Sequence, residues 1–200
     1  NLACACEGGF AECDGDPATI CETDVGTDSA HCGSCTRDCG AAACVAGLCD
    51  PQQVSSAGAV YYFVVVGDEI YYAPDALPGV WHVSAKGGTP AQLDSGAAFA
   101  DLLVHEGGKI YWSSATNILV TDIATGMTDT LAVNQAPALR MGAGGGKVYW
   151  GNVDTMTNVV SIHRTSTTPG GMVEKVTTLL DLKFVQDFAV TPDRVYWNDI

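Results

Sequence analysis

The sequence predicts an all-β chain in two parts: a small disulfide-rich loop module over 1–50 and a strand-repeat region over 51–200. Two observations predict it. All nine cysteines lie between Cys4 and Cys49, and the rest of the chain contains none. From Val54 onward, short apolar runs rich in Val, Ile, Tyr and Trp alternate with turn dipeptides such as Gly-Asp and Pro-Gly. This alternation is typical of strands joined by tight turns.

The first part has few large apolar side chains, and a module of this size usually needs cross-links to be stable. Its cysteines are Cys4, Cys6, Cys13, Cys21, Cys32, Cys35, Cys39, Cys44 and Cys49. We expect eight of them to form four disulfides, in any of roughly a hundred pairings, with one left over. Cys4 and Cys6 are the candidates for the odd thiol because they are nearest the terminus. Disulfides persist only in an oxidising compartment, which predicts an extracytoplasmic protein that is secreted, at the cell surface or periplasmic.

Two metal sites are alternatives in this module. The two-residue gap between Cys32 and Cys35 suits zinc, but no second pair repeats that spacing. Four acidic side chains suit Ca²⁺, which prefers several oxygen ligands. They also suit turn formation on a solvated face. We therefore expect no cofactor, with Ca²⁺ as the alternative, and the candidate calcium ligands are Asp14, Asp16, Glu22 and Asp24.

The second part repeats an aromatic signature about every 40 residues, and each copy follows a turn. A four-stranded unit that recurs at this interval is typical of a β-propeller blade. The predicted blades are 69–106, 107–144 and 145–191, followed by an opening strand in 192–200. Because side chains alternate along a strand, the tyrosine should lie on one face and its two neighbours on the other. The four copies are Ile70-Tyr71-Tyr72, Ile110-Tyr111-Trp112, Val148-Tyr149-Trp150 and Val195-Tyr196-Trp197.

The fold class is therefore an incomplete β-propeller of about three four-stranded blades plus an opening strand, preceded by the disulfide-rich module. A closed ring needs at least four blades. We expect that the natural chain continues beyond Ile200 or that other copies complete the sheets. No signal-peptide pattern is present, so we expect Asn1 to follow a processing site or to lie within a longer chain.

Both parts resemble known families. Ala11 to Cys49, with its Cys21-Glu22-Thr23-Asp24 step and its closing segment from Cys44, resembles the cysteine-rich repeat module of secreted myxobacterial proteins. That resemblance implies an exported, surface-associated protein in which the module precedes a β-rich domain. The repeat region is similar to YWTD-type and NHL-like propellers at its Tyr-Trp core. Only Asp199 keeps the acid of that motif.

Charge and hydropathy exclude several functions. The formal net charge is −14, and no cluster of Lys or Arg is present. Nucleic acid is therefore excluded as a partner, because phosphate binding needs a basic surface. The longest apolar run, Ala57 to Val66, is too short for a transmembrane helix and is interpreted as a buried strand.

The leading functional hypothesis is a non-catalytic binding or structural module in an extracytoplasmic assembly. A protein partner or self-assembly is expected, with carbohydrate as the other ligand class. One alternative is a propeller-type lyase or hydrolase acting on carbohydrate or lactone, with His82, His105 or His163 near the central channel. Another is a Ca²⁺-dependent adhesion module. The sequence contains no nucleophile elbow and no zinc-protease motif, so no catalytic residue is assigned.

Overall fold

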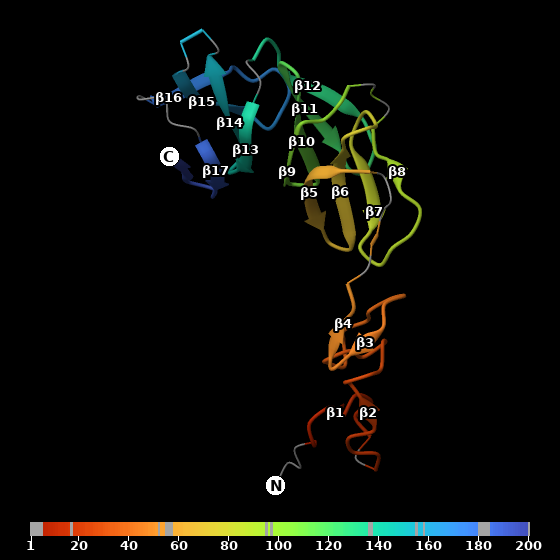
Figure 1. Ribbon diagram of the computed structural model, residues 1–200. Coiled ribbons are helices and arrows are strands. Elements are labelled where there is room, and N and C mark those ends of the chain that lie inside the picture. Colours follow the sequence, from red (N-terminus) through yellow and green to blue (C-terminus); the bar gives the residue numbers. More distant parts are fainter. Residues whose placement is uncertain are drawn as a thin grey trace. The chain divides into compact units, whose positions relative to one another are not determined.

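The computed structural model describes residues 6–16, 18–51, 53–54, 58–94, 96, 98–135, 138–154, 156–157, 159–179 and 185–199. The chain divides into two compact units, Asn1–Ser56 with Ser84–Thr89 and Ala57–Val83 with Pro90–Ile200. Every regular element in the described ranges is a β-strand (Figure 1). No helix among these residues is long and apolar enough to cross a membrane. The all-β fold class is therefore confirmed.

The first unit is built from turns, two short hairpins and disulfides. Strand β1 (Phe10–Ala11) pairs with β2 (Thr23–Asp24), and β3 (Cys44–Val45) pairs with β4 (Leu48–Cys49). Its small core consists of Cys32, Cys39, Ala42 and Cys44, so sulfur replaces the aliphatic side chains that the sequence lacks. The disulfides are Cys6–Cys21, Cys13–Cys35, Cys32–Cys44 and Cys39–Cys49. Cys4 lies outside the described residues.

The second unit contains four antiparallel sheets in chain order. Sheet one comprises β5 (Val60–Val66), β6 (Glu69–Pro74), β7 (Trp81–Ser84) and β8 (Ala91–Gln92). Sheet two comprises β9 (Leu102–Glu106), β10 (Lys109–Ser114), β11 (Asn117–Asp122) and β12 (Thr128–Ala132). Sheet three comprises β13 (Ala138–Gly144), β14 (Lys147–Asp154), β15 (Val159–Ser166) and β16 (Glu174–Leu179). Sheet four comprises β17 (Val185–Val190) and β18 (Val195–Asp199).

Successive sheets pack face to face, and the aromatic strand is the second strand of each. In sheet two, Ile110 and Trp112 pack against sheet one, whereas Tyr111 packs against sheet three. The predicted alternation of the motif is therefore confirmed. We call the face that carries the first and third motif residues the front face, and the face that carries the central tyrosine the back face. The back face of each sheet covers the front face of the next.

The sheets begin one strand earlier than the predicted blades. The prediction began each blade at the aromatic strand, but β5 precedes that strand in sheet one, and β9 belongs to sheet two. The reason is that turns such as Gly67-Asp68 join two strands of one sheet in a hairpin. The sequence marks these hairpins clearly, whereas the loops between sheets have no comparable signal. The shift also explains why sheet four has two strands instead of a single opening strand.

The interpretation of Ala57 to Val66 as a buried strand is wrong for one face of β5. Tyr61, Phe63 and Val65 alternate along that strand and are exposed. The residues between them pack into the core against sheet two. The run is apolar on both faces, so its composition could not show that only the back face of β5 is covered.

Candidate functional site

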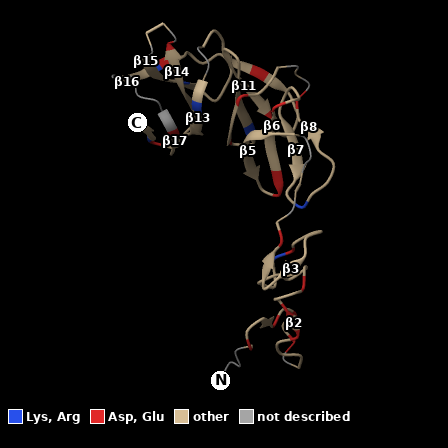
Figure 2. Ribbon diagram, in the orientation of Figure 1, with Lys and Arg blue, Asp and Glu red and all other residues tan. Residues whose placement is uncertain are grey.

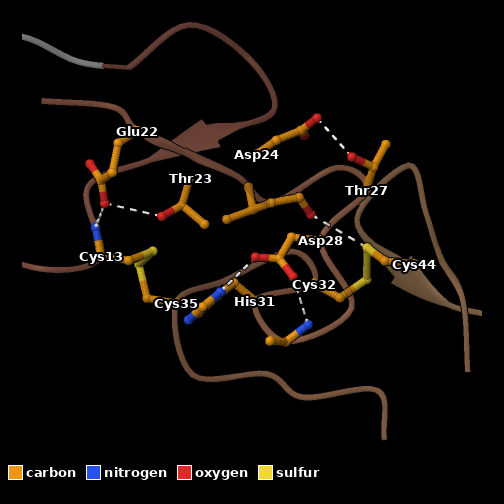
Figure 3. Close-up of polar contacts among 12 residues, drawn as sticks. Cys13, Glu22, Thr23, Asp24, Thr27, Asp28, His31, Cys32, Cys35 and Cys44 are labelled. Carbon is orange, nitrogen blue, oxygen red and sulfur yellow. Dashed lines mark hydrogen bonds and ion pairs between the residues drawn. A yellow bond between two sulfur atoms is a disulfide. The ribbon is translucent and has the colours of Figure 1, made fainter. Parts of the chain in front are cut away.

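Three acidic side chains of the first unit meet in space. Carboxylate oxygens of Glu12, Asp14 and Glu22 lie within 4.8 Å of one another. Asp14 and Glu22 were predicted as candidate calcium ligands, but Glu12 was not. It lies beside Cys13, whose backbone N–H donates a hydrogen bond of 2.9 Å to Glu22 Oε1 (Figure 3). No signal in the sequence distinguishes Glu12, because Asp38 and Asp50 also adjoin cysteines and do not belong to this cluster.

The pKa values of Glu12 and Glu22 shift in opposite directions. Burial raises the pKa of Glu12, and the neighbouring Asp14 and Glu22 raise it further, against a hydrogen bond from the Gly15 N–H. The Cys13 N–H lowers the pKa of Glu22. Glu12 Oε2 is shielded from solvent and has no hydrogen-bond partner among the described residues. Three carboxylate oxygens that lie this close together suit a hard cation such as Ca²⁺.

The carboxylates of the other two predicted calcium ligands do not belong to this cluster and accept hydrogen bonds in turns. Asp16 Oδ1 accepts a hydrogen bond of 2.9 Å from the Ala18 N–H. Asp24 accepts one of 2.9 Å from the Gly26 N–H and one of 2.7 Å from the Thr27 hydroxyl (Figure 3). Aspartate side chains commonly stabilise turns by accepting hydrogen bonds from residues two or three positions further along the chain.

The cysteines of the predicted zinc alternative belong to different disulfides. Cys32 is bonded to Cys44, and Cys35 to Cys13. Zinc binds cysteine as a free thiolate, so this pair does not form a zinc site.

The three histidines of the enzyme alternative lie in three different sheets. His82 in β7 lies 2.9 Å from Glu69 Oε2 and stacks on Tyr71. His105 is in β9 of sheet two. None of the three lines the cleft described below.

His163 in β15 has the more enzyme-like surroundings. Its Nε2 lies 2.8 Å from the Ser161 hydroxyl, and its ring stacks on Trp150. Its Nδ1 is buried without a hydrogen-bond partner among the described residues. A serine nucleophile needs a base that a third group orients, and none of the acidic residues that the structure describes is bonded to this Nδ1.

A cleft of about 320 Å³ opens between sheet one and the connection that leads to sheet two. The end of β6 supplies one wall, and the connection from β8 to β9 supplies the other. The lining residues are Tyr61, Tyr62, Ala73, Pro74, Asp75, Phe99, Ala100 and Asp101. Cavities of this size are at the lower end of those that hold small ligands or side chains of a partner.

Local contacts hold the walls of this cleft in place. The Asp75 backbone N–H donates a hydrogen bond of 3.0 Å to the Ala59 carbonyl. Asp101 Oδ2 accepts one of 3.1 Å from the Ala115 N–H. The Arg140 guanidinium donates one of 3.4 Å to the Tyr62 hydroxyl.

Sequence reasoning did not find the cleft, because its residues come from strand ends and a loop and form no motif. The combination of carboxylates and aromatic rings defines its chemistry. The cleft belongs to a chain in which acidic residues greatly outnumber basic ones (Figure 2).

Comparisons with known proteins support the fold. No family model matches the sequence, and no curated protein matches it significantly. The computationally designed Ika4 protein is similar in structure, with a TM-score of 0.57 and 12% identity over 75% of this chain and 93% of that chain. The designed Ika8 protein has a TM-score of 0.53 and 12% identity over 70% of this chain and 42% of that chain.

A chain of the nidogen/laminin complex is also similar, with a TM-score of 0.50 and 15% identity over 61% of this chain. The match spans 49% of that chain, so this protein corresponds to about half of it. At these identities the likeness concerns the fold alone. The described sheets are open and propeller-like, and the four disulfides indicate an extracytoplasmic protein.

Proposed function

We propose that the protein is a non-catalytic binding module of an exported or cell-surface assembly, and that its cleft receives cationic side chains of a protein partner. The disulfides support the compartment, as does the resemblance of Ala11 to Cys49 to the secreted myxobacterial module. A nidogen/laminin complex among the similar structures agrees with a protein partner. The observation that carries the proposal is the cleft between sheet one and the connection from β8 to β9.

The chemistry of the cleft favours a cation. Asp75 and Asp101 line it, and neither carboxylate has an ion-pair partner among the described residues. Phe99 and the two tyrosines add ring faces, which attract cations through their quadrupole. The net charge of −14 steers basic partners toward the molecule from a distance.

A titration with two probes tests this proposal. We expect a short oligolysine peptide to bind, and a neutral oligosaccharide such as maltohexaose not to bind, by isothermal calorimetry at low salt. Asp75→Asn and Phe99→Ala should each weaken oligolysine binding by about fivefold, as expected for one lost contact of ~1 kcal/mol. The control is Asp129→Asn, which removes the same charge from an exposed position on β12.

If the control weakens binding as much as Asp75→Asn, the attraction is general and the cleft proposal fails. If maltohexaose binds and Phe99→Ala abolishes that binding, the ligand class is carbohydrate instead.

A second candidate function is Ca²⁺-dependent adhesion, and the solvent-shielded oxygen of Glu12 favours it. A bound cation would relieve the repulsion that raises the pKa of this carboxyl. Ca²⁺ should then raise the melting temperature of the protein, whereas Glu12→Gln should remove the effect. Equal melting temperatures in Ca²⁺ and in chelator would contradict this candidate. The lyase or hydrolase alternative stays a prediction, with its three histidines in three different sheets.

A further inference from the structure

The same contact between sheets occurs three times within the chain. In each case the central tyrosine of the motif lies on a back face that the next sheet covers. Tyr71, Tyr111 and Tyr149 are therefore only 5%, 2% and 9% exposed. Tyr196 occupies the same position in sheet four and is 50% exposed. Sheet four thus has an uncovered back face.

The front faces show the complementary pattern. The residue paired with the third motif position is Phe63 in sheet one, Leu103 in sheet two and Met141 in sheet three. Leu103 and Met141 are 5% and 7% exposed, but Phe63 is 62% exposed. Tyr61 and Val65 beside it are exposed as well. Tyr72, the third motif residue on the same face, is only 2% exposed, so the uncovered part of the front face of sheet one is its β5 strand, which is aromatic and aliphatic there.

The junction between sheets three and four shows what such a front face fits. A methyl group added to Gly142 on the back face of β13 would lie 2.5 Å from Val190 Cγ2 and 3.4 Å from Phe188 Cδ1. Phe188 and Val190 are the front-face residues of β17. Sheet four therefore packs tightly because the opposing back face carries a residue without a side chain.

The two uncovered faces carry the two halves of that junction. Phe63 and Val65 occupy the positions of Phe188 and Val190, since both pairs oppose the third and first motif residues. Ala189 on the back face of β17 occupies the position of Gly142, since both oppose the central tyrosine. A phenylalanine and a valine on one open face thus match a small residue on the other.

We propose that the front face of sheet one docks a second copy of this chain through the back face of that copy's sheet four. This contact would repeat the junction between sheets three and four. A two-fold axis would generate two such contacts, which would bring together eight sheets in one ring. Because the two contacts cover both open faces of each copy, this arrangement stops at two copies.

This inference goes beyond the proposed function, because it does not use the cleft carboxylates. Tyr61 lies at the edge of both surfaces, so the experiment uses Phe63, which does not line the cleft. Failure of one proposal therefore leaves the other standing.

Light scattering coupled to size exclusion tests the contact. We expect the chain to have twice its monomer mass of 20.8 kDa at high concentration. Phe63→Glu and Tyr196→Glu should each shift it to the monomer mass, with an increase in dissociation constant of about tenfold or more. The control is Met156→Glu, at an apolar residue that is 97% exposed in the turn between β14 and β15, which should leave the mass unchanged.

A mixture of the two variants gives the sharpest result. In a mixed dimer one junction carries both changes, and the other keeps an unmodified front face against an unmodified back face. We expect the mixture to form dimers at concentrations where each variant alone is monomeric. A monomeric parent chain at every concentration would overturn the proposal. So would a dimeric Phe63→Glu variant, or a mixture that behaves as its components do.

Discussion

Trp112 and Trp150 occupy the same position in successive sheets, but their indole nitrogens have different surroundings. Trp112 Nε1 donates a hydrogen bond of 2.9 Å to the buried Thr121 hydroxyl, which also lies 2.8 Å from the Thr128 hydroxyl. Trp150 Nε1 is buried without a partner among the described residues. The equivalent Thr165 donates its hydroxyl to the Met172 carbonyl instead. The repeat fixes where each ring lies, and the second half of each sheet decides its polar contacts.

Replacing Thr121 with valine should destabilise the protein. The change keeps the shape of the side chain but leaves the Trp112 N–H buried without an acceptor, which typically costs about 1–3 kcal/mol. The free energy of unfolding in urea measures the effect. Thr121→Ser is the matched control because it keeps the hydroxyl. Equal destabilisation by both changes would contradict the role of the hydrogen bond, because serine keeps the acceptor and valine does not.

His163 should make stability depend on pH. Burial lowers its pKa in the folded state, and nearby Lys175 lowers it further. The unfolded chain therefore binds a proton more readily than the folded chain, so the contribution of His163 is present above the unfolded pKa of about 6.5 and is lost as the pH falls below it. In His163→Gln the free energy of unfolding should fall less between pH 7 and about pH 5 than in the parent protein. Identical pH profiles would contradict the effect.

At the scale of the strand, the close approach of β17 to β13 depends on a missing side chain. Gly142→Ala would place a methyl group 2.5 Å from Val190 Cγ2. Because the backbone there does not require glycine, the effect is one of overpacking, and we expect a loss of about 1–3 kcal/mol in unfolding free energy. Gly8→Ala is the control, since its added methyl meets nothing within 4 Å. A neutral Gly142→Ala would mean that the junction between sheets three and four is loose.

The sequence was sufficient to predict the strands and the two faces of the aromatic motif, because both depend on local periodicity. It was not sufficient to predict the sheet boundaries. A glycine turn that joins β9 to β10 has a clear signal, whereas the loop before β9 has none. The grouping of Glu12 with Asp14 and Glu22 and the cleft around Phe99 depend on contacts between distant segments, which no spacing encodes.

At the scale of the whole molecule, disulfides stabilise the first unit and apolar packing stabilises the second. Every described disulfide lies in the first unit, and all four tryptophans lie in the second. The first unit has a core of little more than cysteine, whereas buried aromatic and aliphatic side chains form the core of the second.

Reduction should therefore unfold only the first unit. Removing a native disulfide from a small domain typically costs about 2–5 kcal/mol, and the first unit would lose four. We expect faster hydrogen exchange in β3 and β4 after treatment with reductant, with no change in β10 and β14. Tryptophan fluorescence should also stay constant. A change in tryptophan emission on reduction would show that the sheets depend on the disulfides.

The fold that the designed Ika4 protein shares with this chain depends on one repeated feature, the packing of back faces on front faces. Hydroxyl-radical footprinting of dilute native protein tests that packing most directly. We expect Trp112 and Trp150, which are buried between sheets, to resist oxidation, whereas the exposed Phe63, Tyr196 and Met156 are modified. Oxidation of Trp112 and Trp150 at the rate of Met156 would contradict the account.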